Sequence, residues 1–198
     1  MMLTEVARFP DAALPLDACK AHLRLGTGFS DDGGQDGMIL RYLRAAVLAV
    51  EARIGKALIA RSFVWRLTDW RDGHAAILPI APIQEVSAMR LIGRDGTSEI
   101  VAQELYGLRP DMHRPKLVPK GWLLPAVPTG GAVEVEFVAG FGPTWQELPA
   151  DIAQAVMLLA AQYHESRHGT ATGPAMPFGV MALIERWRVV RTSASGAR

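Results

Sequence analysis

The chain has 198 residues, 49% of them hydrophobic, and a formal net charge of +1 at pH 7. It is long and apolar enough to fold around one sizeable core, and its balanced charge gives no global case for binding nucleic acid or membranes. The single cysteine, Cys19, excludes an intrachain disulfide and a cysteine-based metal site. No apolar run approaches the roughly 20 residues that span a bilayer, and residues 1–15 lack a signal-peptide pattern. We therefore expect no membrane partner and assembly in the cytoplasm of the producing cell.

Two helices are predicted in the first quarter of the chain, over residues 15–25 and 38–55. The second has apolar residues at helical spacing, and Gly55 is a suitable end for it. Its apolar stripe consists of Ile39, Leu43, Ala46, Val47, Val50 and Ile54. The loop between the helices carries Asp31, Asp32 and Asp36. No Glu completes the ligand pattern of a calcium loop, so we interpret these as acids that favour a helix start.

Between about residues 58 and 140 the apolar pattern changes to the period of two that is typical of strands. Strands are predicted at residues 63–68, 76–80, 86–92, 97–101, 105–109, 116–118 and 133–137. The sequence Gly-Arg-Asp-Gly at residues 93–96 is a strong hairpin signal. We therefore expect a small antiparallel β subdomain between the second and third helices.

A long helix is predicted next, from Pro149 to His168, as the centre of the core. One of its faces carries Ile152, Ala155, Val156, Leu159, Ala160 and Tyr163. A second apolar stripe, formed by Met157, Leu158 and Ala161, flanks this face. The helix therefore has more apolar surface than one neighbouring element can cover. A last helix is expected over residues 178–189, followed by a basic free-standing tail at residues 191–198.

Together these elements predict an α+β fold. It has a helical core of about four helices with an antiparallel β subdomain inserted between helices two and three. We divide the chain into N-terminal helices of the core (1–57), the β subdomain (58–142), C-terminal helices of the core (143–190) and a flexible tail (191–198).

The segment from His164 to His168 matches the H-E-x-x-H motif, in which two histidines bind zinc and the intervening Glu165 activates water. A zinc-dependent hydrolase is therefore one alternative function. Against it, Arg167 places a charge inside a segment that metalloproteases bury, and no later histidine supplies a third ligand. His168 also lies at the expected helix end. We therefore assign no catalytic, cofactor-binding or metal-binding residue, and expect no cofactor.

A second alternative is a DNA-binding accessory protein. Arg114, Lys116 and Lys120 lie in one short segment with few acids, and such a patch can neutralise phosphates. A solvated loop is the simpler interpretation. Tyr163 and the five tryptophans are spread over predicted strands and helices, so we interpret them as packing residues rather than as a platform for stacking bases.

Several sequence landmarks follow one another in a recognisable order. They are Leu16-x-x-Cys19-Lys20-x-His22-Leu23, Ala52-Arg53-Ile54-Gly55-Lys56-Ala57-Leu58, Leu78-Pro79-x-x-Pro82-Ile83-x-x-Val86, Arg94-Asp95-Gly96, Val135-x-Phe137-x-Ala139-Gly140-Phe141-Gly142, Leu148-Pro149-x-x-Ile152-x-x-Ala155 and Tyr163-x-x-x-Arg167. In this order they resemble the head–tail connector (adaptor) proteins of long-tailed phages, and especially the version encoded by gene transfer agents. The resemblance covers about residues 14–188, and the histidines of the zinc motif fall outside its pattern.

The resemblance implies a non-enzymatic structural protein at the head–tail junction of a virion or phage-like particle. Such proteins form a ring beneath the portal, usually a dodecamer, which extends the DNA channel and docks the stopper and tail. DNA passes without sequence-specific binding. The carboxy-terminal segment grips the portal, which here implies Val189, Val190, Arg191, Thr192, Ser193 and Ala194. Because a ring subunit must cover its apolar sides with two neighbours, we expect Met157, Leu158, Ala161 and Trp187 at the subunit interface.

Overall fold

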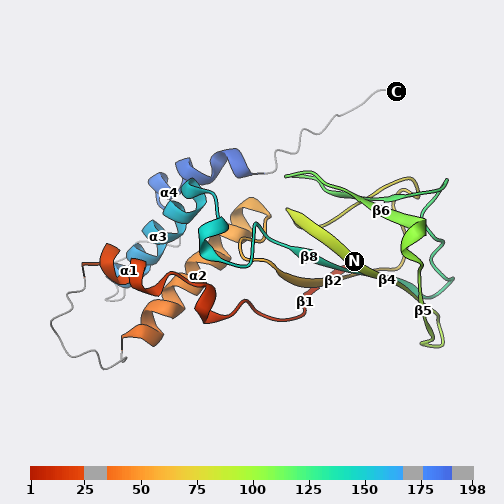
Figure 1. Ribbon diagram of the computed structural model, residues 1–198, viewed down its shortest axis with the longest axis horizontal. Coiled ribbons are helices and arrows are strands. Elements are labelled where there is room, and N and C mark those ends of the chain that lie inside the picture. Colours follow the sequence, from red (N-terminus) through yellow and green to blue (C-terminus); the bar gives the residue numbers. More distant parts are fainter. Residues whose placement is uncertain (25–34, 167–175, 189–198) are drawn as a thin grey trace.

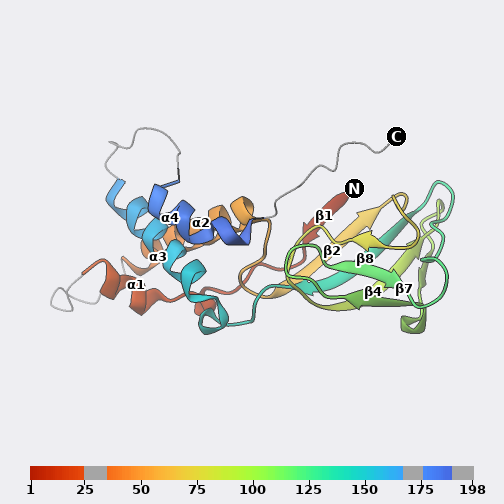
Figure 2. The same ribbon diagram turned by 90° about the horizontal axis from the view of Figure 1, so that it is seen from above.

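Helices and strands occupy opposite ends of an elongated molecule (Figure 1). A computed structural model describes residues 1–24, 35–166 and 176–188. Seen from above, the helices group at one end, the strands group at the other, and a narrower waist joins the two (Figure 2). We call these ends the helical half and the β half.

The helical half is built on α2 (Asp36–Ile54) and α3 (Ala150–Glu165), which pack against each other. The predicted apolar stripes of both helices are buried in one cluster. Two shorter helices, α1 (Leu16–His22) and α4 (Phe178–Ile184), cover this pair, and a 3-10 turn, η5 (Glu185–Trp187), follows α4. Gly55 ends α2 as predicted, in a left-handed conformation (φ 68°) that glycine adopts without a steric penalty.

The larger sheet of the β half has five antiparallel strands in the order β1-β2-β8-β4-β5. Their bounds are β1 (Met2–Glu5), β2 (Arg61–Leu67), β4 (Ile83–Ile92), β5 (Ser98–Ile100) and β8 (Ala132–Ala139). The predicted alternation is confirmed, since Phe63 and Trp65 of β2 lie inside, opposite Phe137 and Val135 of β8. The edge strand β1 was not predicted.

A smaller antiparallel sheet covers the inner face of the larger one. It consists of β3 (Ala76–Ile77), β7 (Lys116–Pro119) and β6 (Tyr106–Arg109), in that order. Leu117 and Tyr106 are buried in the same apolar cluster as Trp65 and Val135 of the larger sheet. The β half therefore has its own core, separate from that of the helical half.

These observations confirm the predicted α+β fold: the described residues form four helices and two antiparallel sheets, and every strand except β1 lies between α2 and α3 in the sequence. The hairpin at residues 93–96 joins β4 to β5. Three short 3-10 turns, η1 (Asp11–Ala13), η2 (Gln103–Leu105) and η3 (Trp145–Glu147), complete the named elements. Within the described residues, no helix is both long and apolar enough to cross a membrane.

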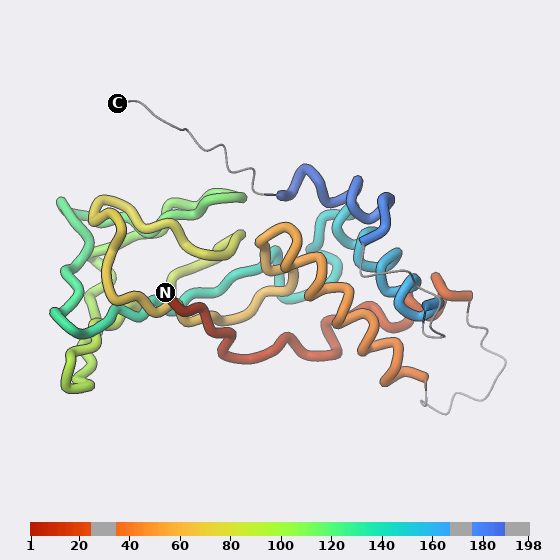
Figure 3. The backbone as a smooth tube through the Cα atoms, turned by 180° about the vertical axis from the view of Figure 1, so that it is seen from behind, coloured from red at the N-terminus to blue at the C-terminus, as the bar shows by residue number. Residues whose placement is uncertain are grey.

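The waist between the halves is tightly packed. The chain crosses it after β1, before β2 and after β8, as the tube in Figure 3 shows. Gly140 has a φ of 139°, and a Cβ atom at this position would lie 2.4 Å from the Cα atom of Ala60. Only glycine fits such a close approach of two backbones. The crossing after β8 and the crossing before β2 are therefore in direct contact.

Candidate assembly surfaces

A buried ion pair fixes the waist. Both terminal nitrogens of the Arg61 guanidinium donate to the carboxylate of Glu51 on α2, at 2.9 and 2.8 Å, and Arg61 is the first residue of β2. The Arg61 Nε atom lies 2.9 Å from Oε1 of Glu5 on β1, as an ion pair rather than an aligned hydrogen bond. Desolvation alone would lower the pKa of Arg61, but the carboxylates of Glu51 and Glu5 outweigh it and raise this pKa. One cation thus ties a helix to two strands.

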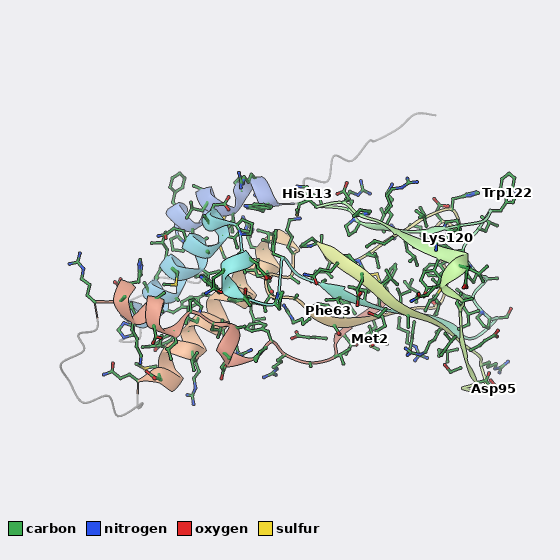
Figure 4. All side chains as sticks on the ribbon, in the orientation of Figure 1. Met2, Phe63, Asp95, His113, Lys120 and Trp122 are labelled. Carbon is green, nitrogen blue, oxygen red and sulfur yellow. The ribbon has the colours of Figure 1, made fainter. Side chains whose placement is uncertain are left out.

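A buried lysine makes the second link between the halves. Lys56 follows α2 and its residue is 0% exposed. Its ammonium donates to the backbone oxygen of Met112 and lies 3.3 Å from Nδ1 of His113, both in the loop between β6 and β7. Burial lowers the pKa of Lys56 below 10.5, although the Asp111 carboxylate opposes this shift. Figure 4 accordingly shows His113 at the end of the β half that faces the helices.

The residues expected at a subunit interface lie on two elements of the helical half. Met157, Leu158 and Ala161 are only partly buried on α3, and the first two pack against the helical core. Trp187 makes contacts within its own subunit. Its Nε1 atom donates to Oδ2 of Asp151 at 2.8 Å, and its ring meets Phe141 edge-on with 5.5 Å between centroids. Part of Trp187 therefore serves the fold of the subunit.

Sequence reasoning missed the most exposed aromatic side chain of the chain's described part. Phe178, at the start of α4, is 90% exposed. Met176, Phe178, Met181, Ala182 and Glu185 line a shallow, mostly apolar hollow of about 470 Å³. The signal was present in the sequence, because Phe178 stands off the helical stripe formed by Val180 and Ile184. Because aromatic side chains are frequent anchors of protein interfaces, Phe178 is a candidate contact residue.

One prediction about the tryptophans is wrong. Trp122, expected to pack, is 88% exposed at the end of the β half farthest from the helices (Figure 4). It lies in the loop between β7 and β8, beside the exposed Leu123. Trp65 is buried as expected, because it sits on the inner face of β2. Trp122 lies in a loop, outside the alternating pattern of the strands, so no pattern in the sequence indicated that it would pack.

The zinc motif has only its first two residues in the described part of the chain. His164 and Glu165 end α3, and the His164 ring meets Tyr42 edge-on with 6.1 Å between centroids. His168 lies outside the described residues. Over residues 1–24, 35–166 and 176–188, no group of three or more His, Cys, Asp or Glu side chains is placed to hold a metal ion.

The basic residues of the DNA-binding alternative lie on or beside the β6–β7 hairpin. Arg114 is in its loop, Lys116 begins β7, and Lys120 follows β7 directly. The Asp111 carboxylate accepts hydrogen bonds from the backbone amides of His113 and Arg114, both at 2.7 Å, and these hydrogen bonds lower its pKa. The expected portal-binding residues, Val189, Val190, Arg191, Thr192, Ser193 and Ala194, fall outside the described part of the chain.

Comparison with known proteins finds closely similar chains among the solved structures. No family model matches the chain, and no curated protein matches it. A chain from the neck of an empty gene transfer agent particle, computed with C6 symmetry, is 55% identical over 98% of both chains, with a TM-score of 0.90. A chain from the virion of a native gene transfer agent particle is 55% identical over 98% of both, with a TM-score of 0.88. A third, from the neck of a native particle computed with C12 symmetry, is 50% identical over 98% of both, with a TM-score of 0.86.

These likenesses place the chain in the class of structural proteins of gene transfer agent particles. With 55% identity over 98% of both chains, it belongs to the family of neck proteins of gene transfer agent particles. The expected relationship to gene transfer agents and the expected location at the neck are thereby confirmed.

Proposed function

We propose that this protein is the adaptor subunit of the neck, a head–tail connector that forms a ring beneath the portal. In this role it lengthens the channel through which DNA leaves and presents the surface on which the stopper and tail dock. The observation that carries the proposal is the 55% identity, over 98% of both chains, to a chain of a gene transfer agent neck. The order of sequence landmarks supports the adaptor role among the roles of neck proteins.

Ring formation is supported by symmetry. Necks that contain the relatives were computed with C6 and C12 symmetry. In a closed ring each copy presents two different surfaces, one to each neighbour, and rotation by a fixed angle closes the assembly. We propose a dodecamer, in agreement with the higher of these two symmetries.

The helical half supplies one of these ring surfaces. We propose that a neighbouring copy covers the exposed parts of Met157, Leu158, Ala161 and Trp187, together with Phe178. The aromatic side chain of Phe178, 90% exposed beside an apolar hollow, has the character of an interface anchor. A neighbouring copy is the occupant because cyclic symmetry requires that every copy cover part of another.

The tail is proposed to bind the portal. Together with the two residues before it, so over residues 189–194, it would bind the rim of the portal through backbone hydrogen bonds, which make few demands on side chains. The division into helical segments (1–57 and 143–190), β insert (58–142) and tail (191–198) then corresponds to ring formation, channel or docking surface, and portal attachment.

Co-expression with the portal tests this function. The full chain is expected to form a ring that co-purifies with portal rings, with its mass measured by light scattering and its symmetry by electron microscopy. Replacing residues 189–198 with a glycine–serine segment of equal length should leave the subunit folded but abolish co-purification. Unchanged binding of this variant would overturn the role of the tail. Failure of the full chain to enter the neck of assembled particles would overturn the adaptor assignment itself.

A further inference from the structure

The outward face of the smaller sheet carries a row of basic side chains. Alternate residues of its strands point into the core, where Tyr106 of β6 and Leu117 of β7 are buried. Arg109 and Lys116 occupy the other positions and therefore face outward. They stand directly opposite each other in the register of the two strands.

A third basic residue completes this face. A Cβ atom on Gly107 of β6 would lie 3.6 Å from the Cε atom of Lys120, so the Lys120 side chain passes over this glycine. Its ammonium donates to the backbone oxygen of Gln103 at 3.1 Å. Figure 4 shows Lys120 on the side of the β half opposite Met2 and Asp95. We call Arg109, Lys116 and Lys120 the basic face.

These three cations have no acidic partner in the described part of the chain: none of the ion pairs there includes Arg109, Lys116 or Lys120. The outer face of the larger sheet is different. There Arg66 pairs with Glu134 at 2.8 Å, and Arg90 pairs with Glu136 at 3.0 Å. The same fold thus balances charge on one sheet face and leaves it unbalanced on the other.

The arrangement is unfavourable for the isolated subunit. Like charges directly opposite each other on neighbouring strands repel and destabilise the pair. Folding gives no reason to place Arg109 against Lys116, since both are outside the core. An external anion that binds both side chains removes this repulsion.

We propose that the basic face contacts the phosphate backbone of double-stranded DNA, and that it is the surface that lines the channel. This inference rests on the proposed adaptor function, in which DNA passes through the ring. Lysine and arginine neutralise phosphates without regard to sequence, which allows DNA to slide.

Fluorescence anisotropy of the full chain with a labelled duplex tests the contact. Binding should be measurable at about 20 mM salt and should weaken steeply as salt rises, because released counterions drive it. The variant R109Q/K116Q/K120Q is expected to bind at least about tenfold more weakly, and its slope of log K against log salt should be smaller by about 0.9 for each lost phosphate contact.

A matched control removes the same charge elsewhere. Arg8, Arg71 and Arg94 are exposed and take part in no ion pair of the described chain. The variant R8Q/R71Q/R94Q should keep its affinity to within about twofold, because only local cations release counterions. The proposal is overturned if both triple variants lose affinity equally, or if the unmodified chain does not bind the duplex.

An experiment on assembled particles distinguishes this inference from the adaptor function. The R109Q/K116Q/K120Q variant should enter the neck at the normal level, while DNA release slows or becomes less complete. If instead it binds DNA normally and is left out of the neck, the basic face docks on an acidic protein and the DNA proposal is wrong. Absence of the unmodified chain from necks would contradict the adaptor function and leave the anisotropy result unaffected.

Discussion

The guanidinium of Arg61 and the carboxylate of Glu51 form two parallel hydrogen bonds, at 2.9 and 2.8 Å, between the first residue of β2 and the last turns of α2. Oε1 of Glu51 also accepts a hydrogen bond from the backbone amide of Leu58 at 2.6 Å. The carboxylate therefore supports both a buried cation and the connection that leads from helix to strand.

The variant Glu51→Gln should lower the free energy of unfolding by about 3–5 kcal/mol, because the buried Arg61 charge then keeps only the less buried carboxylate of Glu5. Urea denaturation followed by circular dichroism measures the loss. Glu134→Gln is the control, since it breaks the more exposed pair with Arg66 and should cost less than about 1 kcal/mol. Equal losses in the two variants would contradict the role of the waist pair.

Lys56 should make stability depend on pH in the alkaline range. Its pKa is lowered by burial in the folded state, whereas the unfolded chain keeps the ordinary value of 10.5. Between the two values the unfolded state binds more protons, so the stability contributed by Lys56 rises with pH, by at most about 1.4 kcal/mol per pH unit, and is constant above 10.5.

Comparison with Lys56→Met isolates this contribution, since the other titrating groups are common to both proteins. The difference in unfolding free energy should shift in favour of the unmodified protein as pH rises toward 10.5. A difference that stays flat from neutral pH upward would show that the Lys56 ammonium is not destabilised by burial.

Two variants of Trp187 test whether its side chain stabilises the isolated subunit as well as the proposed ring. Trp187→Phe keeps an aromatic ring against Phe141 but loses the hydrogen bond to Asp151, and should lower the free energy of unfolding by about 1 kcal/mol. Trp187→Ala should cost about 2–4 kcal/mol, because packing is lost as well. Thermal unfolding of the isolated subunit measures both. A subunit of unchanged stability would mean that Trp187 acts only between copies.

Phe178→Ser should leave the subunit as stable as before, to within about 0.5 kcal/mol, because its side chain is exposed. Its association into rings should weaken, as measured by light scattering over a dilution series. Ile100→Ser, on β5, removes another exposed apolar side chain and serves as the control. Rings that form equally well with both variants would exclude Phe178 from the subunit interface.

The main elements could be predicted because their patterns are local. The alternation in β2 and β8 and the stripes of α2 and α3 reflect burial of one face, which the sequence shows directly. Strand β1 carries no such pattern, since most of its residues are exposed and only its pairing with β2 makes it a strand. Long-range pairing of this kind leaves no local trace.

The candidate surfaces were harder to predict for the same reason. Lys56 follows a helix end, where a lysine is ordinarily solvated, and only the returning loop at Met112 and His113 buries it. The pairing of Arg109 with Lys116 likewise depends on strand register. The sequence indicated a basic segment at Arg114, Lys116 and Lys120, but not that Lys116 would face Arg109 on the neighbouring strand.

The close contact of Gly140 with Ala60 determines how the subunit responds to mechanical load. A hinge needs backbone that can change its torsion angles, and at this waist two backbone segments leave no room even for a methyl group. Each subunit should therefore behave as one rigid body, without a hinge at the waist. In the proposed ring, any widening or twisting of the channel as DNA moves through would then occur at the contacts between adjacent copies.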